Sequence, residues 1–531
     1  MSDGFVTVAQ CVEGLPVGRT VWEALICAFF AWFLLGVINE PTPMAFSFLP
    51  ADPAEHEWVP SREEAVLTQS AALAFGSFLA ILVGGCLADL YGRLNVIRPA
   101  LLCTICGAML VQLSRTFAQA VASRFILGLA SGSLFGVIPP LIAELLPSRH
   151  RGLYLTIWCS GWPLGSMAAI ASTSFLPGLN WRALHLMILV PAMMLYVFIR
   201  AEMLPESPRY LYLSGRRDEG YITLVDMYEK QMIPLPWNPE AISVTSSKRR
   251  EPLDAASKFN SLLMSENALS ILLAVVMFSV SAAAQSMKLW MPTMLVAEEA
   301  DAAVAPGRHM RRGFAALLQA DPKLGFASGP KAVSMLSMAR APLMLRQPNY
   351  TVILMLLQGY VIELVGIVIL AYLSTKVCRK SLIQWALLAA TFFTLVMLGM
   401  AESGFIITCG PLLGAQLAAQ ATALNFLQAF ASEHFPTSRR AKTTAFVSFA
   451  AQLGNFTIPV VGGSIVRRVS AAGAVIFFSV LYVVGWILSH RLPLPVSQEE
   501  PLHDVEEEAP PKKKSTRAHS RKRDLINYHA C

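Results

Sequence analysis

The chain contains twelve long stretches with little or no charge, and these stretches constrain its fold more than any other feature. About 20 consecutive apolar residues cross the hydrocarbon core of a bilayer as a helix, and spanning segments must satisfy their backbone hydrogen bonds internally. The first six stretches are residues 21–48, 65–87, 96–113, 117–143, 153–177 and 181–199, and the second six are residues 268–295, 350–373, 381–400, 404–431, 443–466 and 471–489. The sequence therefore predicts an all-α membrane protein with about 12 transmembrane helices.

Composition agrees with this prediction, because 55% of the residues are hydrophobic and only 15% are charged, against about 25% charged in soluble domains. Only Arg19 is basic ahead of the first stretch, and that stretch is too long for a signal peptide, so we expect it to stay in the chain. Cys103 and Cys106 form a C-x-x-C pattern inside an apolar stretch, with no second pair nearby. We interpret them as packing residues and expect no metal site.

The basic residues of the short loops predict the orientation in the membrane, because Lys and Arg concentrate on the cytoplasmic side. The loops after even-numbered stretches carry Arg93, Arg98, Arg149, Arg151, Lys376, Arg379, Lys380, Arg439, Arg440 and Lys442. The opposite short loops carry Arg62, Arg115, Arg182, Arg467 and Arg468. Both termini and the long segment 202–266 are therefore expected in the cytoplasm, and the long segment 297–349 on the exoplasmic side.

An internal repeat divides the chain into two halves. The sequence "ELLPSRHR" begins at Glu144, and "EHFPTSRR" begins 289 residues further on at Glu433. The loop "DLYGRL" from Asp89 has a counterpart "TKVCRK" 286 residues further on, from Thr375. Two separate pairs share nearly one offset, so the sequence predicts two copies of a six-helix unit facing the same way.

Three motifs carry a resemblance to a known family. "GGCLADLYGRL", "RFILGLASG" and "PESPRYL" are similar to motifs of the major facilitator superfamily, most of all its branch of synaptic-vesicle-two-related proteins and sugar and organic-ion porters. The resemblance implies two six-helix bundles. We assign residues 1–20 to a cytoplasmic N-terminus, 21–204 to the first bundle, 205–266 to a cytoplasmic central loop, 267–490 to the second bundle with an exoplasmic loop 297–349, and 491–531 to a disordered cytoplasmic tail.

The same resemblance implies a conformational gate that holds the halves closed at the cytoplasmic end. The residues assigned to it are Gly85, Asp89, Gly92, Arg93, Arg124, Glu144, Arg151, Glu206 and Arg209, with Glu433 and Arg440 from the second half. Glycine at position 92 would permit a turn with positive φ, whereas the second-half loop has Cys378 there and lacks the acidic residue. The alternative is that these charges only fix the topology and the helix ends.

Charged residues closer to mid-membrane are the candidates for the solute or ion pathway, because burying a charge there costs about 2.5 kcal/mol or more. They are Glu40, Lys288 and Glu363, with Trp158, Trp162, Gln285 and Asn425 as further candidates for the lining. A carboxylate at position 363 suits proton or cation coupling; alternatively it pairs with Lys288 and only joins two helices. For Trp158, Trp162 and Asn425, ordinary helix packing is the alternative.

Together with the resemblance, these features predict a secondary active or facilitative transporter of a small polar, charged organic solute, an organic ion or a sugar-like molecule, working by alternating access. The alternative is a receptor or trafficking partner that keeps the fold without transport. We expect no enzyme activity and no cofactor, since the chain lacks a G-x-x-x-x-G-K-[ST] loop for ATP. The expected partners are the solute, membrane lipid and, if transport is coupled, a proton or cation; we expect no nucleic acid. The protein is expected to be a monomer in the plasma membrane or an endomembrane vesicle.

Overall fold

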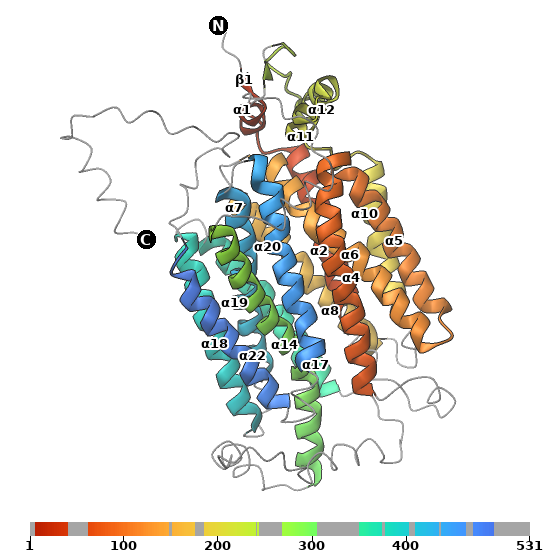
Figure 1. The fold of residues 1–531 in the computed structure, drawn as a ribbon, viewed down its shortest axis with the longest axis vertical. Coiled ribbons are helices and arrows are strands. Elements are labelled where there is room, and N and C mark those ends of the chain that lie inside the picture. The colour runs from red at the N-terminus through yellow and green to blue at the C-terminus, as the bar shows by residue number, and fades with distance from the viewer. Residues whose placement is uncertain are drawn as a thin grey trace, which may run out of the picture.

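The computed structural model describes residues 6–40, 62–147, 151–175, 185–240, 242–243, 268–304, 350–373, 377–402, 409–434, 437–462 and 471–492. The expected tail 491–531 and most of the expected exoplasmic loop 297–349 lie outside these ranges. Apart from one short strand pair, the described regular structure is helical. Figure 1 shows the long helices side by side in one elongated bundle. The all-α membrane fold expected from the apolar stretches is confirmed.

The first half begins with long helices and ends with shorter ones. Its helices are α2 (Arg19–Asn39), α4 (Arg62–Tyr91), α5 (Leu94–Leu113), α6 (Phe117–Leu145), α7 (Arg151–Trp158), α8 (Gly161–Phe175), η2 (His185–Ile188) and α10 (Leu189–Arg200). The expected helix over 153–177 is therefore two helices, since the chain turns between Trp158 and Gly161. Gly161 and Pro163 follow the break directly, and proline in a first helical turn is a signal for such a start that the prediction of one helix overlooked.

The second half consists mainly of long helices. They are α14 (Ala268–Val304), α17 (Tyr350–Leu373), α18 (Arg379–Glu402), α19 (Cys409–His434), α20 (Thr437–Thr457), the π-helical turn η5 (Ile458–Gly462) and α22 (Ala471–Ser489). Helix α14 continues beyond the expected end at residue 295, through "AEEADAAV" to Val304. Alanine and glutamate favour helix, so the chain does not break where its hydropathy falls.

Within the described residues, eight helices are long and apolar enough to cross a membrane. Two shorter apolar helices, His185–Arg200 and Val475–Ser489, fall on two more of the expected stretches. Helix α19 has 26 residues but carries Gln416, Gln420 and Asn425, which lower its hydropathy. The count of twelve membrane-crossing helices remains a prediction.

Small residues bring helices of the first half into close contact. A Cβ atom at Gly36 of α2 would lie 2.3 Å from the carbonyl oxygen of Trp162 in α8, and one at Gly128 of α6 would lie 2.2 Å from that of Leu73 in α4. Helices in lipid associate through such close backbone approach, because burial from water does not drive their contact. The α2–α8 contact places the end of α2 beside Trp162.

The most extensive contacts between the halves form two sets. Helix α4 of the first half packs along α20 of the second, and α17 packs against both α7 and α8. The facing surfaces of α4 and α20 carry aromatic rings, with the centroids of Phe78 and Phe449 4.5 Å apart. These contacts define the interface at which a pathway between the halves would lie.

A small folded unit lies at the end of the bundle that carries the N-terminus (Figure 1). It consists of β1 (Val6–Thr7), α1 (Val8–Glu13), α11 (Pro208–Leu213), α12 (Arg217–Glu229) and β2 (Ile242–Ser243), and we call it the terminal unit. The strands pair in parallel, with Val6 opposite Ile242. The N-terminus and the middle of the chain therefore fold together, although we assigned them to separate segments.

Candidate functional site

Arg93 is the centre of a charged cluster at the end of the bundle next to the terminal unit. Its Nη2 lies 3.3 Å from Glu144 Oε1 and 3.8 Å from Asp89 Oδ1, although its residue is only 7% exposed. Its guanidinium carbon lies 4.4 Å from the centroid of the Tyr210 ring. Burial disfavours the charged form, but the carboxylates of Glu144, Asp89 and Glu206 outweigh it and raise the pKa of Arg93. The buried cation is thus balanced by nearby acids.

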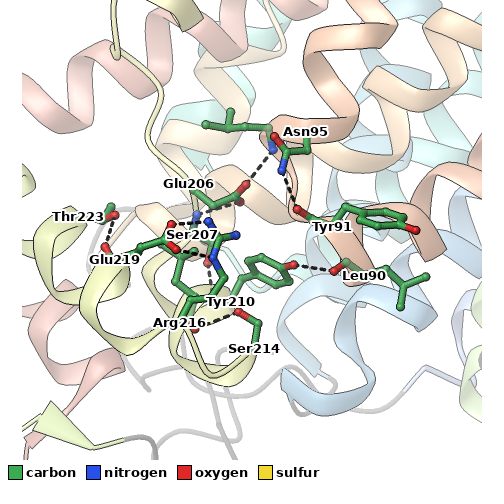
Figure 2. A network of polar contacts seen from close by, with 12 residues as sticks. Leu90, Tyr91, Asn95, Glu206, Ser207, Tyr210, Ser214, Arg216, Glu219 and Thr223 are labelled. Carbon is green, nitrogen blue, oxygen red and sulfur yellow. Dashed lines mark hydrogen bonds and ion pairs between the residues drawn. The ribbon is translucent and has the colours of Figure 1, made fainter. Parts of the chain in front are cut away.

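Glu206 completes this cluster by capping α5. Its carboxylate accepts hydrogen bonds from the backbone N–H groups of Arg93 and Leu94, at 3.1 and 3.0 Å. A carboxylate at a helix N-terminus satisfies N–H groups that have no partner within the helix and interacts favourably with the helix dipole. Figure 2 shows Glu206 directed at the start of α5, with the Tyr210 hydroxyl donating to the Leu90 carbonyl oxygen at 3.0 Å. We call Asp89, Arg93, Glu144, Glu206 and Tyr210 the charge cluster.

The structure places the other expected gate residues as follows. Gly85 of α4 faces α20, because a Cβ there would lie 3.1 Å from the Cβ of Ala445. Gly92 has a φ of +103°, as its position in the loop predicts. Arg209 is buried in α11, at 3% exposure. Arg151, Glu433 and Arg440 lie in α7, α19 and α20, but their side chains are outside the described part of the structure.

Arg124 requires a correction to this grouping. It lies on α6 twenty residues before Glu144, which corresponds to roughly 30 Å along a helix. Its fully buried guanidinium donates from Nη1 to the carbonyl oxygen of Ile38, near the end of α2, at 3.2 Å. The motif suggested a common role with Arg93, but the length of the helix separates the two arginines. Arg124 belongs to the opposite part of the first half.

A second polar group lies between the two halves. The Tyr360 hydroxyl of α17 donates to Glu40 Oε1 at the end of α2, at 2.5 Å. Glu363 lies one turn further along α17 and is 2% exposed, and it interacts electrostatically with both Glu40 and Lys288 of α14. The Lys288 ammonium lies 5.0 Å from the centroid of the Trp162 ring of α8. We call Glu40, Trp162, Lys288, Tyr360 and Glu363 the interface cluster.

Glu363 and Lys288 therefore interact, but not as the close pair that we considered as an alternative. Among the described residues, Glu363 Oε2 is buried without a hydrogen-bond partner, and the Lys288 ammonium is directed at an aromatic ring. Gln285 lies one turn before Lys288 on α14 and is half-buried. The four elements α2, α8, α14 and α17 thus bring two carboxylates and one ammonium together across the interface.

Trp158 and Asn425, two expected lining residues, contribute to a small cavity between the halves. Its volume is about 20 Å³, and it is lined by Pro139, Ala143, Trp158, Cys159, Asn425, Gln428 and Ala429. A space of this size holds about one water molecule. Trp158 also stacks on Trp32, with ring centroids 5.2 Å apart. Packing and lining roles thus coexist at Trp158, and the cavity is too small for an organic solute in this conformation.

Sequence analysis missed Tyr360 and the polar group around Tyr482. Tyr360 precedes Glu363 by three residues, which places both on one face of α17, and this spacing is the signal that could have identified it. In the second half, Gln416 donates to Gln420 and to the Tyr482 hydroxyl, both at 3.0 Å. The spacing of the two glutamines is one helical turn, but nothing in the sequence indicated their partner on α22.

Comparison with known proteins places this two-half arrangement in a class of membrane transporters, the major facilitator superfamily, whose profile matches residues 331–527. The profile described as sugar (and other) transporter matches residues 21–289, which is about half of the chain. The protein belongs to the sugar (and other) transporter family. This confirms the resemblance inferred from the motifs, and members of this superfamily are transporters and not enzymes.

Relatives and solved structures are similar at lower identity. The chain is 29% identical over 225 residues to the niacin transporter NiaP of Acinetobacter baylyi, covering 41% of this chain and 48% of that protein. It is 26% identical over 244 residues to the synaptic vesicle 2-related protein of Bos taurus, covering 46% and 43%. The chain thus matches about half the length of these relatives. The structure of the proton:xylose symporter XylE bound to 6-bromo-6-deoxy-D-glucose superposes on this chain with a TM-score of 0.61 at 14% sequence identity. The superposition covers 91% of this chain and 98% of that one, and it supports the fold.

Proposed function

We propose that the protein is a secondary transporter that moves a small polar, charged organic solute between its two halves by alternating access. The observation that carries this proposal is Glu363, a carboxylate held midway along α17 at 2% exposure, in a cluster to which both halves contribute. Ionisable residues inside a membrane are rare and usually mark a pathway for a substrate or an ion. The proteins that the chain resembles include transporters of niacin and of xylose.

In this proposal, the charge cluster acts as a gate at the end that carries the terminal unit. Its contacts form within the first half, while the neighbouring Gly85 of α4 contacts Ala445 of the second half. Rocking of the halves would separate α4 from α20 at this end, and the charge cluster would stabilise the state in which they touch. We assign this end to the cytoplasm, together with both termini, and the membrane to the cell surface or an endomembrane vesicle.

Uptake by the purified full chain in liposomes tests the proposal. We expect accumulation of one member of a broad panel of charged and neutral solutes, against none in protein-free liposomes. The absence of flux for the whole panel would favour the alternative, a receptor or trafficking partner with the same fold. Accessibility labelling of a cysteine at partly exposed Thr223 in α12 tests the orientation. Labelling from outside intact cells contradicts it.

Glu363→Gln separates the two ways in which this carboxylate could serve transport. If Glu363 carries a coupling proton, the variant should lose concentrative uptake and its pH response but retain solute exchange, since exchange does not require an empty carrier to return. If Glu363 binds a cationic solute, exchange should weaken too, with a higher KM. Glu219→Gln removes an exposed carboxylate of α12 and serves as the matched control. Wild-type uptake with a wild-type pH response in Glu363→Gln would exclude both roles.

A further inference from the structure

The interface cluster has an uneven charge balance. Glu40 and Glu363 supply two carboxylates at 8% and 2% exposure, while Lys288 supplies one ammonium within electrostatic reach of Glu363. When all three groups are ionised, the cluster carries one net negative charge away from water. Buried carboxylates in such a place require compensation by a cation or a proton. The groups of the cluster therefore leave one negative charge that a further positive charge would compensate.

Two buried polar atoms of the cluster indicate which hydrogen-bonding groups a bound solute would need. Within the described residues, Glu363 Oε2 has no hydrogen-bond donor and Trp162 Nε1 has no acceptor. A buried group left without its hydrogen bond costs about 1 to 3 kcal/mol, more when the group is charged. A bound proton would compensate Glu363 but would leave Trp162 Nε1 unpaired. A solute that carries an N–H donor and an acceptor atom would satisfy both.

The Trp162 ring already holds a cation in this conformation. The Lys288 ammonium lies 5.0 Å from the ring centroid, within the distance at which an indole face attracts a positive charge. The same ammonium acts on Glu363 from across the cluster. Lys288 is a long, flexible side chain that is only partly buried, so it can withdraw at little cost in packing. The ammonium therefore shows that the region between the Trp162 ring and Glu363 stabilises a positive charge.

We propose that the interface cluster binds the protonated amine of a small organic cation between Glu363 and Trp162, where the amine replaces the Lys288 ammonium as the compensating positive charge. This inference rests on the proposed transport function and specifies its substrate class. Glu363 Oε2 accepts the N–H of the amine, Glu40 contributes the second negative charge, and Trp162 Nε1 donates to an acceptor elsewhere on the solute. Tyr360 holds Glu40 in place through its hydroxyl.

Binding to the purified full chain tests this substrate class with three probes of one shape. 3-(Aminomethyl)pyridine is a cation at neutral pH, nicotinamide is neutral and nicotinate is an anion, and each carries a pyridine nitrogen as acceptor. We expect the amine alone to raise the Tm of the protein with a saturable dose response. Its trimethylated quaternary analogue keeps the charge but has no N–H, so it should bind about tenfold more weakly or worse, as when a hydrogen bond to a charged group is lost. Stronger stabilisation by nicotinamide or nicotinate, or none by the amine, overturns the proposal.

Two variants test the assigned residues. Glu363→Gln should weaken amine binding by about tenfold or more, while Glu219→Gln should leave it unchanged. Lys288→Met keeps most of the length of the side chain but removes the internal competitor, so the amine should bind more tightly than to the unmodified protein. Loss of amine binding in Lys288→Met would contradict the role of Lys288 as a competitor. Nicotinate binding that requires Lys288 would identify the lysine as an anion site and overturn the proposal. The probe comparison on the unmodified protein remains decisive if a variant does not fold.

Uptake measured beside binding separates this inference from the proposed function. Amine binding without flux would support the cation site and contradict transport. Flux of nicotinate or of a neutral solute without amine binding would support transport and overturn the cation site. Binding and flux of the amine, both weakened in Glu363→Gln, would support both.

Discussion

Gly92 joins α4 to α5 in a conformation that other residues adopt only at a cost. Its φ is +103°, and a Cβ atom at this position would lie 2.7 Å from Glu206 Oε2. The glycine therefore does two things. It allows the turn that places Asp89 and Arg93 on one side of the loop, and it leaves room for the carboxylate that caps α5.

Gly92→Ala should destabilise the protein through both effects. A positive φ costs a residue with a side chain about 1 to 2 kcal/mol, and displacing Glu206 from its two N–H donors should add about 1 kcal/mol. Gly215→Ala is the matched control, because Gly215 has a φ of +86° but nothing within 4 Å of an added Cβ. We expect the Tm in detergent to fall further for Gly92→Ala than for Gly215→Ala. Equal Tm values for the two variants would show that the contact with Glu206 adds nothing.

Tyr360→Phe should destabilise the contact between the halves by leaving a buried carboxylate without its donor. The hydroxyl lies 2.5 Å from Glu40 Oε1, and both residues are buried. Loss of such a donor costs about 1 to 3 kcal/mol. Thermal unfolding measures this, with Tyr91→Phe as the control at an exposed tyrosine of α4. An unchanged Tm in Tyr360→Phe would mean that Glu40 finds another donor.

The charged residues of the candidate site could be predicted from the sequence, but their partners could be predicted only in part. Asp89, Arg93 and Glu144 stand at ends of apolar stretches, where a charge is conspicuous, and a local motif relates two of them. Trp162 was named as a lining candidate with packing as the alternative, whereas Tyr360 was not named, because a tyrosine in a membrane helix commonly serves packing. Glu40 and Tyr360 are separated by 320 residues, and only the folded structure shows that they meet.

The terminal unit is the element that joins the start of the chain to its middle. Its core consists of Val8, Cys11, Val12, Tyr212, Leu224 and Ile242. The Tyr228 hydroxyl donates to the Cys11 carbonyl oxygen at 2.7 Å, and Lys230 Nζ lies 3.0 Å from Glu23 Oε2 of α2. These contacts reach only helices of the first half within the described residues. The terminal unit should therefore move with the first half.

The terminal unit should open at alkaline pH, and the reactivity of Cys11 should report it. Burial raises the pKa of the Cys11 thiol from 9.0 to about 11, and burial likewise raises the pKa of Tyr228 to about 12. A folded-state pKa above the unfolded one means that the stabilisation is present below pH 9 and is lost as the pH rises through 11. Alkylation by iodoacetamide of a variant that retains only Cys11 measures this from pH 7 upward.

The control for this measurement is a cysteine at exposed Leu213, in the same unit but outside its core. Its labelling rate should rise with pH from neutrality, as the thiolate fraction of an ordinary thiol does. Cys11, which has no exposed surface, should stay unreactive until the unit opens. Labelling of Cys11 at the control rate near pH 7 would contradict the buried position of α1.

At the level of elements, the apolar stretches predicted the presence of helices more reliably than the positions of their ends. The stretches 350–373 and 471–489 coincide with α17 and α22, where charged or turn-forming residues follow the last apolar one. The stretch 153–177 was predicted as one helix although Gly161 and Pro163 stand at the start of α8, where such residues indicate a helix boundary. The terminal unit was not predicted, since its two strands have two residues each and pair over more than 230 positions of sequence.

At the scale of the whole molecule, the two halves touch along much of the interface between α4 and α20. Phe75 packs on Phe456, with ring centroids 5.7 Å apart, and Gly85 faces Ala445. Residues 75 and 85 are roughly 15 Å apart along a helix. Both contacts exist in one conformation, so α4 and α20 are in contact over this length. Passage of a solute between α4 and α20 would require one of these contacts to separate.

A disulfide between positions 85 and 445 should therefore stop transport. A Cβ atom at Gly85 would lie 3.1 Å from that of Ala445, close to the separation of about 3.5 to 4.5 Å that a disulfide requires. In Gly85→Cys with Ala445→Cys, made together with Cys86→Ala to prevent mispairing, oxidation should abolish liposome uptake and a reductant should restore it. Each single cysteine variant, treated with the same oxidant, should keep its own uptake. The disulfide would leave both helices folded and would block only their separation. Full uptake by the oxidised double variant would therefore show that α4 and α20 need not separate at this end. That result would contradict the proposed gate there.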